Sequence, residues 1–227
     1  MNLIAKAKAE RRSFLSLYEA LQTIEEYGLP VARYGLAEAA DEAVQLAEEI
    51  GYPVVLKVSS PEIVHKTEVG GVKVGLNTPE EVRRAFNEIL RNAEKHGKKV
   101  EGIVVQEMVS NAHEVIIGGL NDAQFGPVIM VGLGGITVEL LKDVTFEIAP
   151  ITPEEALDAL KRLKTYPLLE GYRGRPKANV SLLARVVAKA SEFLWKYRED
   201  IQEFDLNPTF AASSRCVVGD ARIKIKI

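Results

Sequence analysis

The chain has 227 residues, of which 47% are hydrophobic, and its 29 Lys and Arg against 32 Asp and Glu give a formal net charge of −3. This is the composition of a globular protein with a sizeable core, and it excludes a disordered or collagen-like chain. The near-neutral balance provides no basic stripe for duplex nucleic acid and argues against an anionic membrane surface. Since no apolar run approaches the roughly 20 residues of a membrane helix, we expect neither nucleic acid nor a membrane as partner.

The cysteine content and the start of the chain both bear on the compartment. Cys216 is the single cysteine, which excludes an internal disulfide and a multi-cysteine zinc site. Residues 1–14 are charged and precede no apolar stretch, unlike a secretory signal. We therefore expect a cytoplasmic protein.

The first half of the chain predicts alternating helices and strands. Capping residues followed by apolar positions at helical spacing mark the helix starts, and glycines mark several of their ends. In chain order we expect a helix capped by Ser13 and ended by Gly28, a strand over 31–34, a helix from Asp41 to Ile50, a buried strand over 53–58, a polar loop over 59–71, a strand over 72–76 and a helix from Thr78 to about His96.

The second half is richer in strands. β-Branched runs separated by turn signals predict strands, and the Thr-Pro-Glu-Glu sequence at 152–155 predicts a helix start. The expected elements are strands over 102–108, 114–120 and 127–131, a helix from Thr152, a polar loop over 167–177, a long helix over 179–197 and closing strands over 201–206 and 221–227. The pattern indicates an α+β or α/β protein in two lobes, with a seam near residues 107–110.

Lys57 interrupts an otherwise apolar strand of Val and Leu. Burying a lysine is costly unless an anion meets it. The functional interpretation is a phosphate contact in a cleft, and the structural alternative is an edge-strand lysine that points to solvent. The sequence favours neither.

His65 lies in the polar loop between two predicted strands, among Lys66, Thr67, Gly70 and Gly71. Glycines permit close approach and movement, and a loop histidine can act as acid, base or nucleophile. For an isolated histidine, a solvated loop position without function is the more common situation.

Residues 106–109 end a buried strand at the expected seam. Backbone groups exposed there can pair with a planar heterocycle such as adenine, although most strand ends bind nothing of the kind. Glu114 would point back towards the same region, and its alternative is a carboxylate that faces solvent.

The sequence EFDLNP over 203–208, followed by Asp220, is the strongest local constellation. Glu203, Asp205 and Asn207 alternate and so share one face of a strand, and Asp220 on the next strand can lie beside them. Converging oxygen side chains suit a hard cation such as Mg²⁺. The alternative is an exposed face on which the acids are merely hydrated.

Several segments together resemble the ATP-grasp β subunit of the ADP-forming acyl-CoA synthetases and, more distantly, the β subunit of succinyl-CoA synthetase. They occur in the family's order and cover most of the chain, and the HKTEVGGV block is the most specific. The matching stretches are GYPVVLKVSSPEIVHKTEVGGV (51–72), VVQEMV (104–109), GLGGITVELLKDVTF (132–146), PLLEGYRG (167–174), EFDLNP (203–208) and GDARI (219–223).

The resemblance implies an α+β, two-lobed ATP-grasp fold, with an α/β N-terminal lobe over 1–108 and an antiparallel-sheet C-terminal lobe over 109–227. It implies the reversible reaction of acyl-CoA, ADP and phosphate to carboxylic acid, CoA and ATP. In the family, the acyl phosphate forms on a separate α subunit that binds CoA and carries its own phosphorylated histidine. The phosphoryl group then travels to the ATP-grasp subunit.

The resemblance also implies roles for individual residues. His65 would carry the phosphoryl group on a loop that swings between sites. The nucleotide would meet Lys57 and Arg173 at its phosphates, Glu107 and Val109 at its adenine, and Glu114 near its ribose. Magnesium would be held by Asn207 and Asp220, with Asp205 and Glu203 in support.

On this resemblance we expect Mg²⁺ as cofactor, ATP and ADP as substrates, and a hetero-oligomer of two α and two β chains. A partner is also expected because the sequence has no GxGxxG fingerprint for CoA. At Glu147 the family pattern would have a basic residue, so the local charge differs there if this residue lines the site.

Two other functions remain open from the sequence. One is a non-catalytic ATP-grasp subunit that senses nucleotide or regulates a partner. The other is an ATP-dependent carboxylate–amine ligase, which would share the fold and magnesium but would not need a phosphohistidine.

Overall fold

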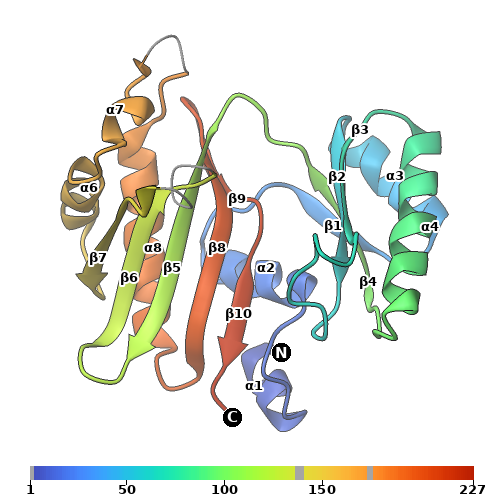
Figure 1. The fold of residues 1–227 in the computed structure, drawn as a ribbon, viewed down its shortest axis with the longest axis horizontal. Coiled ribbons are helices and arrows are strands. Elements are labelled where there is room, and N and C mark those ends of the chain that lie inside the picture. Colours follow the sequence, from blue (N-terminus) through green and yellow to red (C-terminus); the bar gives the residue numbers. More distant parts are fainter. Residues whose placement is uncertain (1–2, 136–140, 173–175) are drawn as a thin grey trace.

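Two sheets, each covered by helices, form two lobes that lie side by side in the computed structural model (Figure 1). The structure describes residues 3–135, 141–172 and 176–227. Strands pair antiparallel in both sheets. The two-lobed α+β fold expected from the sequence is therefore confirmed.

The N-terminal sheet has the strand order β1-β4-β2-β3. Strand β2 lies between β4 and β3 and is buried along its whole length, so Lys57 is on a central strand and not on an edge. Helices α3 and α4 cover the side of this sheet that faces away from the other lobe (Figure 1). The elements are β1 (Tyr34–Ala37), α3 (Ala40–Ile50), β2 (Val54–Ser59), β3 (Val72–Leu76), α4 (Pro79–Lys95) and β4 (Gly102–Glu107).

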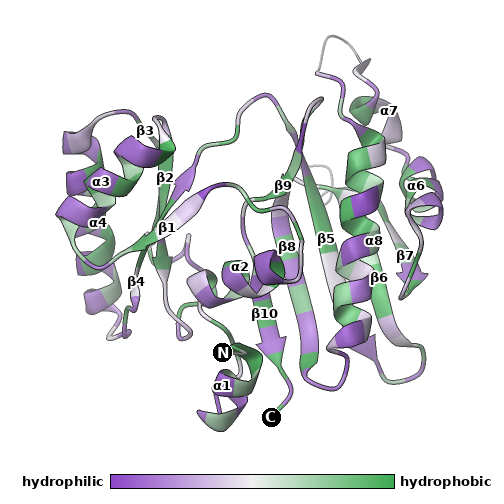
Figure 2. Cartoon of the chain, turned by 180° about the vertical axis from the view of Figure 1, so that it is seen from behind, coloured by the Kyte–Doolittle hydropathy of each residue, from purple (hydrophilic) through white to green (hydrophobic). Residues whose placement is uncertain are grey.

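The C-terminal sheet runs β10-β8-β5-β6-β7, and the short β9 also pairs with β8. Helix α8 lies along one face of this sheet, over β5 and β6 (Figure 2). The elements are β5 (His113–Asp122), β6 (Gly126–Leu133), β7 (Val144–Ile148), α6 (Pro153–Lys161), α7 (Tyr166–Leu169), α8 (Val180–Lys196), β8 (Ile201–Ala211), β9 (Cys216–Val218) and β10 (Arg222–Ile225). Within the described ranges, no helix is long and apolar enough to cross a membrane.

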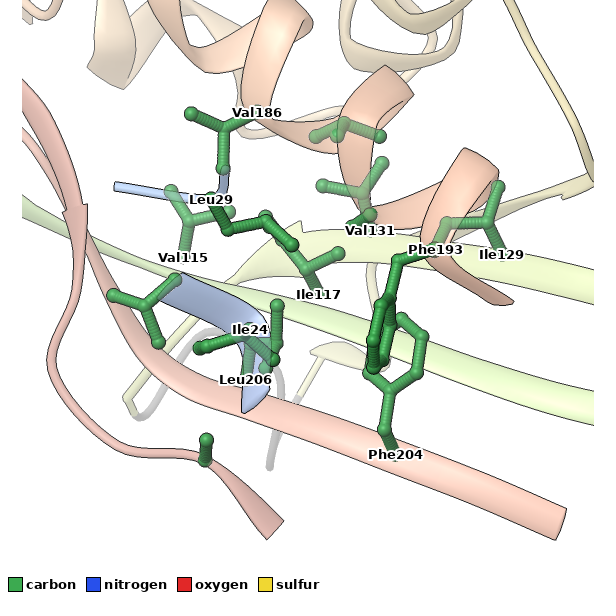
Figure 3. Packing of buried hydrophobic residues seen from close by; sticks show 14 of the residues in the cluster. Ile24, Leu29, Val115, Ile117, Ile129, Val131, Val186, Phe193, Phe204 and Leu206 are labelled. Atoms are coloured by element: carbon green, nitrogen blue, oxygen red, sulfur yellow. The ribbon is translucent and has the colours of Figure 1, made fainter. Parts of the chain in front are cut away.

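Phe193 on α8 belongs to the larger core and is fully buried, with its ring facing Phe204 (Figure 3). Its ring lies 5.8 Å from Phe204 on β8 and 5.3 Å from Tyr27. Aromatic rings at these separations add to the stabilisation that burial of their area provides. This packing fixes β8, the strand on which Asp205 and Asn207 alternate with inward-facing residues.

The first two helices, α1 (Leu3–Ala9) and α2 (Leu17–Glu26), pack with the core of the C-terminal lobe. Ile4, Leu21 and Ile24 all belong to that core. The proposed division between residues 108 and 109 separates the two sheets. Helices α1 and α2 precede this division in the chain, yet they pack in the core of the C-terminal lobe.

Three local predictions were wrong. Residues 166–169 form the short helix α7, where a polar loop was predicted over 167–177. Ser16, not Ser13, caps α2: the Ser16 hydroxyl accepts from the Glu19 N–H at 3.3 Å, and the Glu19 carboxylate accepts from the Ser16 N–H at 3.1 Å. Ser13 has no acid three residues later with which to form this reciprocal pair. A strand was predicted over 31–34, but β1 begins only at Tyr34. Val31 instead forms an isolated bridge with Val218 of the other lobe, where the chain crosses between the lobes.

Candidate functional site

A cleft of about 770 Å³ lies between the two sheets. Its walls come from β2, β3 and β4 on one side and from β5, β8 and the start of β10 on the other. The sequence-predicted site residues that line it are Lys57, His65, Glu107, Val109, Glu114, Asp205, Asn207 and Asp220. Glu203 instead lines a neighbouring apolar groove, to which Asp205 and Asn207 also contribute. Arg173 lies outside the described residues.

Lys57 reaches across the cleft floor from one lobe to the other. Its ammonium donates to Gln106 Oε1 at 2.8 Å and to the Gly219 carbonyl at 2.6 Å, and it lies 3.5 Å from Asp220 Oδ2. Burial lowers the pKa of Lys57 from its ordinary value, and the negative charge of Asp220 opposes that change. A buried ammonium with these partners supports the phosphate-contact interpretation of the sequence over a solvent-facing lysine.

Gln106 on β4 was not selected as a site residue. The Gln106 side-chain oxygen accepts from Lys57, so the Gln106 Nε2 donor points away from Lys57. This Nε2 is buried and has no hydrogen-bond partner among the described residues. Leaving a buried donor unpaired costs about 1–3 kcal/mol. Because Gln106 lines the cleft, a polar ligand there would satisfy Nε2, so these residues fit a nucleotide.

Glu107 fixes the end of β4 at the junction of the lobes. Its carboxylate accepts from Arg33 Nε at 3.2 Å and pairs with Arg215 Nη2 at 2.5 Å. Burial raises its pKa, but the hydrogen bonds from Arg215 and Arg33 outweigh it and hold the pKa below its ordinary value. The Glu107 N–H also donates to the Arg33 carbonyl, at 2.9 Å. Glu107 and Val109 both line the cleft, and Val109 makes no hydrogen bond to another described residue.

The expected cation site lies where β8 and β10 face the cleft. Asp205 is the register partner of Arg222, and Asn207 and Asp220 line the same wall. Burial raises the pKa of Asp205, and the neighbouring charges of Asp220 and Glu203 add to this, against the attraction of Arg222 and Lys66. Carboxylates whose charges repel one another favour a cation between them.

The donor set fits Mg²⁺ bound together with a phosphate ligand. The side chains of Asp220, Asp205 and Asn207 can each offer an oxygen ligand, as Mg²⁺ prefers. Among the described residues, no group of three or more His, Cys, Asp and Glu side chains could hold a metal unaided. Mg²⁺ usually keeps waters and substrate phosphates in its shell, so a protein site with few ligands suits a metal that arrives with nucleotide.

His65 projects from the β2–β3 loop at the mouth of the cleft. Its side chain is 66% exposed, and its Nδ1 lies 4.0 Å from Glu68 Oε1 within the same loop. The ring is thus accessible to a reactant and is not fixed by the core. The loop reaches from the N-terminal sheet towards β10 (Figure 1), where Lys66 Nζ pairs with Asp220 Oδ1 at 2.9 Å. Lys66 is a second site residue that sequence reasoning did not select.

Glu114 is exposed at the start of β5 and lines the cleft. Its carbonyl accepts from the Gly134 N–H at 2.7 Å. A Cβ on Gly134 would lie 3.2 Å from the Glu114 Cβ, tighter than most side chains accept. The glycine-rich loop after β6 therefore permits a close approach beside Glu114.

Glu147, where the family resemblance predicts a basic residue, lies on β7 and pairs with Arg162, the C-cap of α6. It does not line the cleft. Its charge is therefore balanced on the far side of the C-terminal lobe.

Comparisons with known proteins agree with this geometry. Residues 6–225 match the family model described as an ATP-grasp domain. The chain is 43% identical over 223 residues to the β subunit of acetate–CoA ligase (ADP-forming) I of Pyrococcus furiosus, covering 97% of this chain and 95% of the relative.

Two solved structures of acetyl-coenzyme A synthetase 1 from Candidatus Korarchaeum cryptofilum are similar over 99% of this chain and 98% of theirs. One, with coenzyme A, Ca-AMPCP and HgCl⁺, matches with a TM-score of 0.94 at 43% identity. The other, with coenzyme A and Mg-AMPPCP and its phosphohistidine segment pointing towards the nucleotide site, matches with a TM-score of 0.86 at 42% identity. The chain therefore belongs to the ATP-grasp family, among the β subunits of the ADP-forming acyl-CoA synthetases.

Proposed function

We propose that this chain is the nucleotide-binding subunit of an ADP-forming acyl-CoA synthetase and that His65 carries the phosphoryl group to ADP. The observation that carries the proposal is the placement of one exposed histidine at the mouth of a cleft whose floor holds a buried lysine. Asn207 and Asp220 line the wall of the same cleft. Phosphoryl transfer needs alignment and neutralisation of charge more than it needs further covalent chemistry.

The step on this chain is a transfer between two nucleophiles. On the partner, acyl-CoA and phosphate give acyl phosphate and CoA; the phosphoryl group then passes to a histidine of the α subunit as the carboxylate leaves. From that histidine it passes to an imidazole nitrogen of His65, the second carrier, as the N–P bond on the α subunit breaks. At the cleft, a terminal β-phosphate oxygen of ADP forms a bond to phosphorus while the N–P bond breaks. The electron pair of that bond returns to the ring, which gives ATP and free His65.

The cleft residues would bind and orient the nucleotide. The Lys57 ammonium would contact phosphate oxygens, and the Gln106 Nε2 donor would gain the partner that it lacks among the described residues. Backbone groups of Glu107 and Val109 would pair with the adenine edge, and Glu114 would lie near the ribose. Arg173 is proposed as a further phosphate contact on the family resemblance alone.

Asn207 and Asp220 would hold Mg²⁺, with Asp205 in support and Glu203 more remote. Bound there with the nucleotide, Mg²⁺ would neutralise phosphate charge during the transfer. The solved relative that contains Mg-AMPPCP supports this choice of metal.

A separate α subunit is proposed as the site of acyl phosphate formation, since the P. furiosus relative is a β subunit of almost the same length. Two α and two β chains are the proposed assembly, in the cytoplasm, where the free buried thiol of Cys216 would stay reduced. The lobes would divide at residues 108 and 109.

The competing functions differ in what His65 does. A nucleotide-sensing subunit would bind Mg-ADP without turnover, and a carboxylate–amine ligase would form no phosphohistidine. The test is to combine the chain with the α subunit that co-purifies with it and to supply acetyl-CoA, ADP, phosphate and Mg²⁺. We expect ATP to form with the wild type and not with His65→Asn, although both bind ADP equally. ATP formation by His65→Asn, or none by the wild type with any of a panel of acyl-CoA thioesters, would contradict the proposal.

A further inference from the structure

Lys66, the residue after His65, forms an ion pair between the His65 loop and the opposite lobe. Its Nζ lies 2.9 Å from Asp220 Oδ1, and the two side chains are only 14% and 15% exposed. The neighbouring His65 side chain is 66% exposed. The loop is therefore held against the cleft by the side chain next to the reactive histidine.

Asp220 meets an ammonium group at each of its oxygens, since Lys57 Nζ lies 3.5 Å from Oδ2. The two lysines differ in how firmly they are placed. Lys57 projects from a central strand and also donates to Gln106 and Gly219. The Lys66 ammonium has no hydrogen-bond partner besides Asp220 among the described residues. Lys66 is the cation that can leave.

The two ends of the loop are fixed to the N-terminal lobe. Ser60 donates through its hydroxyl to the Lys99 carbonyl at 2.6 Å, and the buried Ile63 belongs to the N-terminal core. At the other end, the Gly70 carbonyl accepts from Asn92 Nδ2 at 3.2 Å. For residues 61–69, Lys66–Asp220 is the ion pair that reaches the C-terminal lobe within the described part of the chain. The Lys66 carbonyl also accepts from the Gly71 N–H at 2.7 Å, but this hydrogen bond lies within the loop. Loss of the ion pair would therefore release the His65 loop from Asp220 without moving the loop ends.

We propose that Lys66 occupies the cation position on Asp220 in the empty cleft and so holds the His65 segment against it, and that a divalent cation arriving with nucleotide displaces Lys66 and frees the segment. This rests on the proposed roles of Asp220 and His65. The divalent ion competes for the same carboxylate oxygen and carries the larger charge, so it replaces the ammonium at that position. His65 would then leave for the acyl phosphate only when its acceptor, ADP, is in place.

The first measurement is cleavage by Glu-C protease after Glu68, whose side chain is 78% exposed, in the full-length chain without partner. A protease needs several residues to detach locally, so the rate reports freeing of the segment. We expect Mg²⁺ with ADP to raise the wild-type rate about fivefold, the scale of opening that one ion pair controls. Lys66→Met should be cleaved at the raised rate with and without Mg-ADP, and Lys66→Arg should behave like the wild type. Equal wild-type rates with and without Mg-ADP would overturn the proposal.

The second measurement is Mg-ADP affinity by calorimetry. Lys66→Met should bind Mg-ADP more tightly, by about fivefold, because no ammonium has to be displaced. Weaker binding would instead assign Lys66 to direct phosphate contact and would overturn the proposal. Asp220→Asn distinguishes failure of the metal site from failure of the Lys66 proposal. If Asp220→Asn weakens Mg-ADP binding while Lys66→Met changes neither the cleavage rate nor the affinity, the metal site is supported and the displacement of Lys66 is ruled out. If Asp220→Asn binds Mg-ADP normally, the proposed metal site itself fails.

Discussion

Arg215, in the connection between β8 and β9, pairs with Glu107 at the end of β4, with 2.5 Å between Nη2 and Oε1. The pair joins the C-terminal lobe to the strand end that is expected to hold adenine. Arg33 donates to the other carboxylate oxygen at 3.2 Å. Glu107 is thereby fixed by two guanidinium groups from opposite lobes.

Removing this link should loosen the junction without unfolding the protein. Arg215→Ala should lower the free energy of unfolding by about 1 kcal/mol, the upper range for a partly exposed ion pair, and should weaken ADP binding because the strand end is less fixed. Urea denaturation and calorimetry measure the two effects. Lys161→Ala, whose partner Asp158 is 70% exposed, is the control; it should stay within about 0.5 kcal/mol of the wild type and leave ADP affinity unchanged. An unchanged ADP affinity in Arg215→Ala would show that the link is not needed for binding.

Glu19 should make stability depend on pH. Its carboxylate receives both Arg12 nitrogens, Nη1 at 2.7 Å and Nη2 at 2.9 Å, and is only 6% exposed. Burial raises the pKa of Glu19, but the hydrogen bonds from Arg12 and the Ser16 N–H outweigh it and lower the pKa. A lowered folded-state pKa contributes stability that is present above the unfolded-state pKa and lost as pH falls through the folded-state value.

Glu19→Gln should therefore cost about 1.5–3 kcal/mol at neutral pH, the scale of hydrogen bonds to a charged group, because it leaves the half-buried Arg12 with Glu10 as its remaining carboxylate partner. The difference between variant and wild type should shrink as the pH falls below the ordinary range of a glutamate. Urea denaturation across pH measures this. Glu10→Gln, which alters the more exposed partner of Arg12, should cost less. A pH-independent difference would rule out the ionised carboxylate as the cause.

Truncation of Phe193 should destabilise the C-terminal lobe. Phe193→Ala empties a fully buried position between Tyr27 and Phe204, and large-to-small core changes of this kind cost about 3–5 kcal/mol. Phe125→Ala removes a ring that is 63% exposed and should stay within about 0.5 kcal/mol of the wild type. Thermal and urea unfolding compare them. Similar losses in the two variants would contradict the placement of the core.

Substitution of Lys57 should weaken ADP binding more than substitution of Gln106. Lys57→Met removes a buried ammonium proposed to meet phosphate and should weaken ADP binding about tenfold or more, the scale of a charged hydrogen bond. Gln106→Leu should weaken ADP binding less, because it removes one neutral donor. Calorimetry at fixed Mg²⁺ gives both affinities. Wild-type affinity in Lys57→Met would remove it from the phosphate site, and the same result in Gln106→Leu would mean that nucleotide does not satisfy Nε2.

Much of this site could be predicted because its signals are local. A lysine within an apolar strand and oxygen side chains at alternating positions of β8 are readable from neighbouring residues. The Lys66–Asp220 pair joins residues 154 positions apart, and the Lys57–Gly219 hydrogen bond joins residues 162 apart. Only the folded chain brings these groups together.

The same limit explains where the predictions failed. Ser13 and Ser16 both precede the first long helix, and only the acid three residues after Ser16 distinguishes the true cap. Glu203 shares the strand face of Asp205 and Asn207, as the alternation predicts, but the cleft does not extend along the strand as far as Glu203. The position along a strand at which a cleft ends depends on the other lobe, which strand periodicity does not encode.

The central claim is that His65 exchanges a phosphoryl group with nucleotide bound in this cleft, and the reverse half-reaction tests it without any partner. The chain is incubated with Mg²⁺ and ATP labelled at the γ-phosphate, and the protein-bound label is mapped. We predict acid-labile, alkali-stable phosphate on the peptide that contains His65, lost in His65→Asn and discharged to ATP when ADP is added. Label that is acid-stable, that persists in His65→Asn, or that never appears on the wild type would contradict the account.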